Sequence, residues 1–396
     1  MPDLALGRLR VEHGSNTGFS TRVRDNFKNE GVFAVSLNKP SDLAGAVAAY
    51  SRQPVREPTP PEPQPIVGSG MDAGPPPPPA DFRALSARLG RDPLRIQGPG
   101  GNTSFKFDDA MWIKASGTEL ADAEERDVFV AVSVSRARAE IDEDSELDGT
   151  CRAAMLDPAS TVRPSIETTF HALMPWRVVS HTHSVSTLAH VVSRQGTQEA
   201  LRKLEGLDAV AVPYRKPGLP LTRAIRDAMV PEAAVFLLRN HGLVVCGNDV
   251  ESVDHLMEEV ERRLALNPWG DTGEGEAFAV PAGWRAVPEF AALARARVPF
   301  ATAGTLYPDH AVFLGPGVGI APDRIAPEQL CAIVPGIGAM LRDGATATQH
   351  KMLRCLYDVI VRVPLDWGVD PIGEDAEAEL MNWDAETYRQ KLAGTA

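Results

Sequence analysis

The middle of the chain alternates short apolar runs, rich in β-branched residues, with segments whose apolar residues have helical spacing. Runs of this length are typical of buried strands, and the alternation favours an α/β fold with a central sheet. Strands are expected at residues 111–114, 128–134, 177–182, 209–214 and 234–246. Helices are expected at residues 165–174, 184–194, 220–229 and 248–266. The last helix has the clearest start, because Asn248 and Asp249 can cap it and Glu251 complements the helix dipole.

Prolines mark a boundary near the N-terminus, since 11 of the 33 lie between Pro54 and Pro79. Each proline removes a backbone donor and restricts φ, so residues 54–80 are expected to form an extended, semi-rigid linker. A proline-rich recognition ligand is the alternative interpretation. Residues 1–53 contain one expected strand (32–37) and one expected helix (41–50), which is too little for a separate core. The sequence does not indicate a role for this short N-terminal segment.

A second boundary is a stretch rich in glycine and proline at residues 267–283. Residues 81–266 are therefore interpreted as the main domain, and residues 267–396 as a smaller C-terminal α/β extension. In this extension, strands are expected at 311–314 and 332–341, and helices at 348–361 and 374–392.

The chain is acidic, with 40 Lys and Arg residues against 53 Asp and Glu residues and a formal charge of −13. The field of such a protein repels polyanions, which argues against nucleic acid or an anionic membrane as a partner. No apolar run approaches the roughly 18 residues of a membrane span, and the first residues lack the apolar stretch of a signal peptide. A soluble, cytoplasmic protein is expected.

The four cysteines are scattered along the chain without a Cys-x-x-Cys pair. Neither a disulfide framework nor a thiolate zinc site is indicated. A metal ion would therefore have to be held by histidines and carboxylates.

His181 and His183 stand two residues apart at the end of an expected strand. Side chains at this spacing point to the same side of a strand, so the two imidazoles can share one metal ion. The pair alone is a weak indication, because a buried, hydrogen-bonded histidine is commoner than a ligand. His241 adds a third imidazole inside an apolar run, and three histidines with an open position are typical of a catalytic zinc site. The following histidines are expected to be structural or surface residues: His171, His190, His255, His310 and His350.

Glu167 stands at the expected start of a helix, just before the strand that carries the first two histidines. One interpretation is a first-turn acid that complements the helix dipole. The other is a carboxylate that enters the metal site and moves a proton on carbon as a general base.

Two small-residue loops lie beside expected strands, at residues 98–104 and 115–118. Backbone N–H groups and hydroxyls in such loops are suited to cradle a phosphate. Neither loop matches the Walker or dinucleotide fingerprint, so no nucleotide cofactor is expected.

In order along residues 81–266, these segments resemble the class II aldolase/adducin family, which includes fuculose-phosphate and rhamnulose-phosphate aldolases and ribulose-phosphate 4-epimerase. Gly101-Asn102-Thr103-Ser104 is similar to the family's Gly-Asn-x-Ser loop, and Ser116-Gly117 to its later Ser/Thr-Gly turn. The other similar segments are Pro164-Ser165-Ile166-Glu167, His181-Thr182-His183 and Asn240-His241-Gly242.

The resemblance implies a three-layer α/β/α sandwich around a mixed central sheet, in a homo-oligomer that is often a tetramer. It implies that His181, His183 and His241 bind Zn²⁺ or another divalent metal and that Glu167 is the acid/base. Tyr214 falls where fuculose-phosphate aldolases carry a tyrosine that reaches the neighbouring subunit's site, so it is a second candidate for proton transfer. The residues implied to hold the substrate phosphate are Gly101, Asn102, Ser104, Ser116, Gly117 and Ser165.

The activity that the resemblance implies is reversible cleavage of a ketose 1-phosphate to dihydroxyacetone phosphate and an aldehyde, through a metal-stabilised enediolate. The alternatives are an epimerase, decarboxylase or dehydratase of a phosphorylated sugar or sugar acid, and a non-catalytic adducin-like interaction module. Three further segments are most similar to the aldolase half of bifunctional aldolase/dehydrogenase proteins of rhamnose utilisation: Lys114–Thr118, Tyr307–His310 and Asn382–Asp384. No dinucleotide fingerprint follows them, so no dehydrogenase half is expected.

Overall fold

The computed structural model describes residues 20–23, 33–36, 74–143, 149–269, 277–291, 293, 297–321, 325–327 and 329–394. The chain forms two compact units, Met1–Met71 and Asp72–Ala396. In the first unit, β1 (Ser20–Val23) and β2 (Phe33–Ser36) pair antiparallel, and β2 coincides with the strand expected at 32–37. The helix expected at 41–50 and most of the expected linker lie outside the described residues.

The second unit is built on a seven-stranded mixed sheet with the strand order β5-β4-β3-β6-β9-β8-β7. β7 and β8 pair in parallel, and the other neighbouring strands pair antiparallel. The strands are β3 (Asn102–Phe107), β4 (Ala110–Lys114), β5 (Phe129–Ser133), β6 (Val178–Thr182), β7 (Ala209–Val212), β8 (Val235–Leu238) and β9 (Gly242–Gly247).

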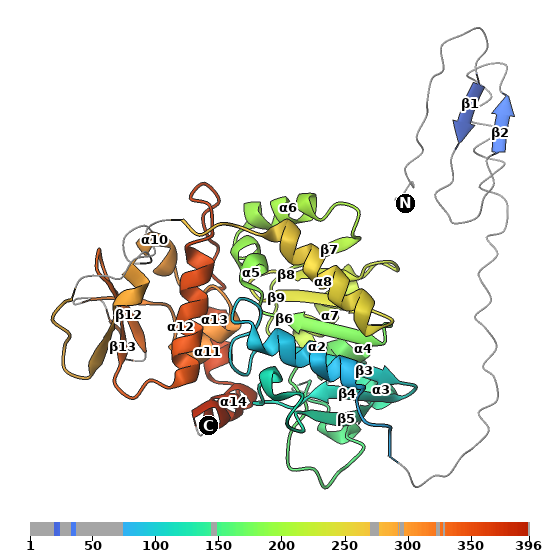
Figure 1. The fold of residues 1–396 in the computed structure, drawn as a ribbon, viewed down its shortest axis with the longest axis horizontal. Helices are drawn as coiled ribbons and strands as arrows, with labels where there is room; N and C mark the ends of the chain where they lie inside the picture. The colour runs from blue at the N-terminus through green and yellow to red at the C-terminus, as the bar shows by residue number, and fades with distance from the viewer. Residues whose placement is uncertain are drawn as a thin grey trace. The chain divides into compact units, whose positions relative to one another are not determined.

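Helices cover both faces of this sheet, because its strands are apolar on both sides. Successive residues of β6 pack into different apolar clusters: Val178 belongs to the cluster of Phe82, Leu188 and Val253, and Val179 to that of Phe170 and Ile225. On the first face lie α2 (Ala80–Arg91), α5 (Val185–Val191), α6 (Arg194–Lys203) and α8 (Val250–Leu264); on the other lie α3 (Val134–Ala139), α4 (Thr168–Leu173) and α7 (Leu219–Ala228). Figure 1 shows α2 and α8 crossing in front of the sheet. The three-layer α/β/α sandwich is confirmed.

The C-terminal extension contains a second, smaller sheet with the order β10-β13-β12-β11. Its strands are β10 (Trp284–Val287), β11 (Gly319–Ile320), β12 (Cys331–Val334) and β13 (Gly338–Arg342). Its helices are α10 (Val298–Ala301), α11 (Pro308–Leu314), α12 (Ala347–Ile360), α13 (Glu374–Met381) and α14 (Asp384–Gly394). One apolar cluster joins the extension to the main sheet, since Leu188 of α5 and Leu353 of α12 both belong to it.

The described residues also include four short 3-10 helices: η2 (Leu120–Asp122), η3 (Glu140–Asp142), η4 (Arg152–Ala154) and η5 (Pro288–Phe290). Among the residues that the structure describes, no helix combines the length and the apolar character needed to cross a bilayer.

The expected strand at 311–314 is wrong, because these residues form the last turns of α11. A short apolar run fits either period, and the helix start is marked by Pro308 at its first position, followed by Asp309. The expected strands at 234–246 and 332–341 are each two strands joined by a tight turn. The sequence pattern did not predict β3 as a strand, because the polar residues of its first half were assigned to the glycine-rich loop at residues 98–104.

Two of the histidines that were expected to be structural or surface residues, His190 and His310, are buried as neutral rings. Burial lowers the pKa of both His190 on α5 and His310 on α11 to about 4. The Nδ1 atom of His310 accepts a hydrogen bond from the backbone N–H of Leu306 at 3.3 Å, which requires the neutral ring. Since the unfolded chain binds these protons near pH 6.5, stability is complete above that pH and is lost as the pH falls toward 4.

We therefore expect His190→Gln to flatten the pH dependence of the unfolding free energy between about pH 6 and pH 4 by up to about 1.4 kcal/mol per pH unit. Chemical denaturation at several pH values measures this slope. His255→Gln, at an exposed position on α8, is the matched control and should leave the slope unchanged. An equal slope in wild type and His190→Gln would contradict the prediction.

Candidate metal centre and active site

His181 and His183 come together at the end of β6, as the alternation of strand side chains predicts. Their ring centroids lie 5.0 Å apart, and His181 is fully buried. The Nδ1 atom of His181 donates to the backbone carbonyl of Leu243 on the neighbouring strand β9 at 3.0 Å. This bond leaves the Nε2 lone pair of His181 free to face the other two rings.

His241 lies in the tight turn between β8 and β9, and not within a strand as expected. Asn240 takes a left-handed backbone conformation with φ of 52°, which asparagine tolerates better than most residues. Gly242 lets β9 approach β6 closely, since a Cβ atom there would lie 2.3 Å from the Thr182 carbonyl oxygen. The two neighbours of His241 therefore shape the turn, and the turn presents its ring to His181 at a centroid distance of 5.0 Å.

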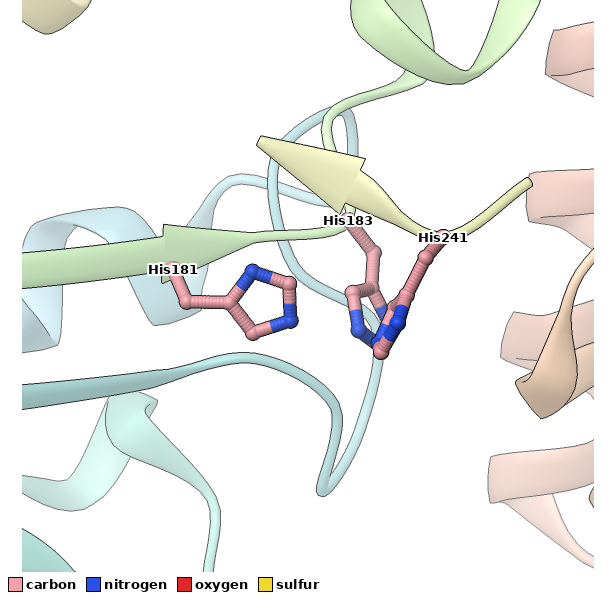
Figure 2. A group of neighbouring side chains, drawn as sticks. All are labelled: His181, His183 and His241. Atoms are coloured by element: carbon pink, nitrogen blue, oxygen red, sulfur yellow. The ribbon is translucent and has the colours of Figure 1, made fainter. Parts of the chain in front are cut away.

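The three imidazoles fit a metal ion. One nitrogen of each ring lies within 4.8 Å of the others, and Figure 2 shows the rings converging from the two strand ends. Among the described residues, His181 Nε2, His183 Nε2 and His241 Nδ1 are buried without a hydrogen-bond partner. Burial lowers the pKa of His181 and lowers that of His241 to about 3, so both rings are neutral, as ligands must be.

Glu167 precedes α4 but makes no side-chain cap to it, so the carboxylate is not engaged as a helix cap. Its Oε1 lies 3.2 Å from His241 Nε2, and its Oε2 lies 3.5 Å from His181 Nε2. Burial alone would raise the pKa of Glu167, but the facing His181 and His241 rings and the Asn102 amide outweigh it, so that pKa lies below its usual value. The carboxylate is therefore ionised beside the histidines at neutral pH.

A cleft of about 390 Å³, partly open to solvent, contains most of the expected site residues. Gly101, Asn102, Ser116, Gly117 and Ser165 line it together with Glu167, His183 and His241. His181 lies beneath it and completes the metal group. The loops at 98–104 and 115–118 thus meet at the histidines, as a phosphate cradle beside a metal requires.

Ser104 is not among the residues that line the cleft. It is fully buried, and its hydroxyl lies 2.7 Å from Nδ1 of His171. His171, expected to be merely structural, contacts the side-chain oxygen of Asn102 through its Nε2. The Asn102 amide nitrogen then donates to Glu167 Oε2 at 2.7 Å and to Ser165 Oγ at 3.1 Å. Ser104 and His171 therefore orient Asn102 rather than contacting a ligand.

Tyr214 also lies outside the lining of this cleft. Its hydroxyl is buried with no hydrogen-bond partner among the described residues, and burial raises its pKa. A role in a neighbouring subunit's site stays a prediction.

Three charged residues in the lining were missed as site residues: Lys114, Asp309 and Arg389. The Nζ atom of Lys114 donates to the carbonyls of Pro99 and Thr118 at 2.6 and 2.9 Å, and burial lowers its pKa to about 7. Lys114 and Asp309 belong to segments that carry the family resemblance, which was the available signal. Arg389, near the end of the chain, had no sequence signal.

The matches to known proteins cover the part of the chain that carries this candidate site. Residues 84–267 match the family model described as Class II Aldolase and Adducin N-terminal domain. The chain is 31% identical over 179 residues to the uncharacterized oxidoreductase YuxG of Bacillus subtilis (strain 168), covering 41% of this chain and 26% of YuxG. It thus spans about a quarter of that relative's length.

Two further matches cover a similar share of this chain. The chain is 29% identical over 184 residues to methylthioribulose-1-phosphate dehydratase of Microcystis aeruginosa, covering 41% of this chain and 82% of the dehydratase. Among solved structures, the N-terminal class II aldolase domain of a conserved Thermoplasma acidophilum protein is 25% identical with a TM-score of 0.42, covering 46% of this chain and 90% of that one. Residues 84–267, which carry the mixed sheet and the histidine group, therefore form a class II aldolase and adducin domain.

Proposed function

We propose that this chain is a metal-dependent lyase that acts on a ketose 1-phosphate, in the first instance as an aldolase that releases dihydroxyacetone phosphate and an aldehyde. The observation that carries the proposal is the convergence of three unpartnered imidazole nitrogens and an ionised carboxylate on one cleft. A non-catalytic interaction module has no chemical need for this combination.

His181, His183 and His241 would hold the metal, and three imidazoles favour Zn²⁺ among the available divalent ions. When bound, a divalent metal acts as a Lewis acid that polarises the substrate's carbonyl oxygen. In cleavage, Tyr214 or water would take the proton of the hydroxyl that becomes the aldehyde, and Glu167 would move the proton on the carbon beside the carbonyl. Asn102 holds the Glu167 carboxylate at 2.7 Å and so aims it into the cleft.

The phosphate would lie against the Ser116-Gly117 turn, the Ser165 hydroxyl and the loop that carries Gly101. These groups offer backbone N–H and hydroxyl donors in the lining of the cleft. Lys114 adds a buried amine to the same lining. The proposed assembly is a homo-oligomer in which Tyr214 reaches a neighbouring subunit's site.

Dehydration of a ketose 1-phosphate is the second candidate. It is favoured by the similarity to methylthioribulose-1-phosphate dehydratase, of which the matched region covers 82%. Both reactions include a proton transfer at a carbon beside a carbonyl, so the same histidines and Glu167 would serve either one.

The test is a panel of ketose 1-phosphates, including L-fuculose 1-phosphate, L-rhamnulose 1-phosphate and 5-methylthioribulose 1-phosphate, offered to the metal-loaded protein. Release of dihydroxyacetone phosphate, measured with a coupled NADH-dependent reductase, identifies an aldolase. A product lighter by one water in mass spectrometry identifies a dehydratase. The unphosphorylated ketoses are the control for the cradle. Neither product from any phosphate, with the metal bound, would overturn the proposal.

A further inference from the structure

The two carboxylate oxygens of Asp309, on the first turn of α11, contact residues from distant parts of the chain. Asp309 is 2% exposed. Its Oδ2 lies 3.0 Å from Nδ1 of His183, while its Oδ1 accepts a hydrogen bond from the Arg389 guanidinium at 3.0 Å. One carboxylate therefore joins a ring of the metal group to the C-terminal helix α14.

The contact is on the side of the His183 ring that faces away from the proposed metal. His183 Nε2 and Asp309 Oδ2 are both buried without a hydrogen-bond partner among the described residues, and Nδ1 is the ring nitrogen that lies 3.0 Å from Asp309 Oδ2. A carboxylate at the second nitrogen of a metal-binding histidine fixes the ring's tautomer and orientation and raises its basicity. Asp309 stands where this effect requires it.

Gly100 gives a second, independent indication that this contact is built into the fold. A Cβ atom at Gly100 would lie 2.9 Å from His183 Nδ1 and 3.0 Å from Asp309 Oδ2. The contact thus occupies the space that any larger side chain at this position would fill.

Arg389 is itself held firmly. Its guanidinium donates to both carboxylate oxygens of Glu386 at 2.8 and 3.0 Å, in addition to Asp309, and it is 8% exposed. The same helix contacts the expected phosphate cradle, because a Cβ atom at Gly117 would lie 2.3 Å from the Leu392 side chain. α14 therefore packs on the cleft and positions Arg389 against Asp309.

We propose that Asp309 is a positioning residue for the metal centre: it orients His183, and Arg389 of α14 holds Asp309 in the orientation that this requires. The C-terminal extension then contributes two supporting residues, Asp309 and Arg389, to the metal centre. This inference rests on the metal site of the proposed function.

The test is metal affinity of the full chain, measured by titrating the metal-free protein with Co²⁺ and following visible absorption, with Zn²⁺ in competition. Asp309→Asn is expected to bind Co²⁺ about 10- to 100-fold more weakly, with an altered absorption spectrum. Arg389→Gln is expected to lose affinity in the same direction, toward the lower end of that range.

Asp358→Asn is the matched control. Asp358 is also a buried carboxylate, 4% exposed, held by Arg354 and Arg362 at 2.7 and 2.9 Å, but it does not line the cleft. It should keep the Co²⁺ affinity and spectrum of the wild type. A purely structural role for Asp309 would make the two Asn variants behave alike.

Gly100→Ala keeps every charge and is expected to displace Asp309 from His183. It therefore tests the role of this contact in metal binding even if Asp309→Asn does not fold. It too should weaken Co²⁺ binding. Wild-type affinity and spectrum in folded Asp309→Asn, or in Gly100→Ala, would overturn the inference. A wild-type protein that binds no metal at all would instead overturn the proposed metal site.

Discussion

Glu167→Gln is expected to lower turnover by about 100-fold or more, while metal and substrate binding persist. The amide keeps the shape of the carboxylate and can still accept the hydrogen bond from Asn102, but it cannot take a proton. The three histidines still supply the metal ligands. The deciding measurement is exchange of a carbon-bound proton of dihydroxyacetone phosphate with deuterated solvent, which requires no aldehyde partner.

Glu251→Gln is the matched control, because Glu251 is an exposed acid in the first turn of α8. A dipole effect there should change stability by under about 1 kcal/mol and leave exchange at the wild-type rate. If Glu167→Gln also exchanged at the wild-type rate, Glu167 would lose its assignment, and the proton would have to move through Tyr214 of a neighbouring subunit or through water.

His241→Ala is expected to reduce the metal content from about one ion per chain to almost none and to abolish turnover with it. Two remaining imidazoles are too few to hold an ion in a catalytic geometry. The fold should survive, because the turn depends on the backbone of Asn240 and Gly242 and not on the ring. His181→Ala and His183→Ala should lose metal in the same way.

Elemental analysis of the purified variants measures the loss, and circular dichroism checks the fold. His255→Ala, at an exposed position on α8, should keep the wild-type metal content. Full occupancy in any of the three cavity variants would remove that histidine from the proposed ligands.

Several features of the site could be predicted because they depend on neighbours in sequence. The two-residue spacing of His181 and His183 alone predicts that their rings share one side of a strand. Asn240 precedes His241 for a local reason, since it tolerates the left-handed backbone conformation of the turn. The α/β class with a central sheet likewise follows from apolar strands that alternate with helical segments, whereas the three-layer arrangement was implied by the family resemblance.

Other features depended on contacts that no local pattern encodes. The apolar residues at 311–314 suit a strand or a helix equally, and only their packing in the shared apolar core makes them part of α11. Ser104 belongs to the same glycine-rich loop motif as Asn102, yet two residues further along β3 its hydroxyl lies next to His171. Because both residues belong to one motif, the motif alone could not show that Asn102 lines the cleft and Ser104 does not.

The sequence by itself supplied the candidate groups, three imidazoles and one carboxylate, and placed two of the imidazoles on one side of a strand. Only the tertiary structure decided what surrounds them. Asp309 reaches His183, and Arg389 reaches Asp309, because α11 and α14 pack against each other beside the cleft. Contacts between segments so far apart depend on how whole apolar faces fit together, and residue spacing along the chain carries no record of that fit.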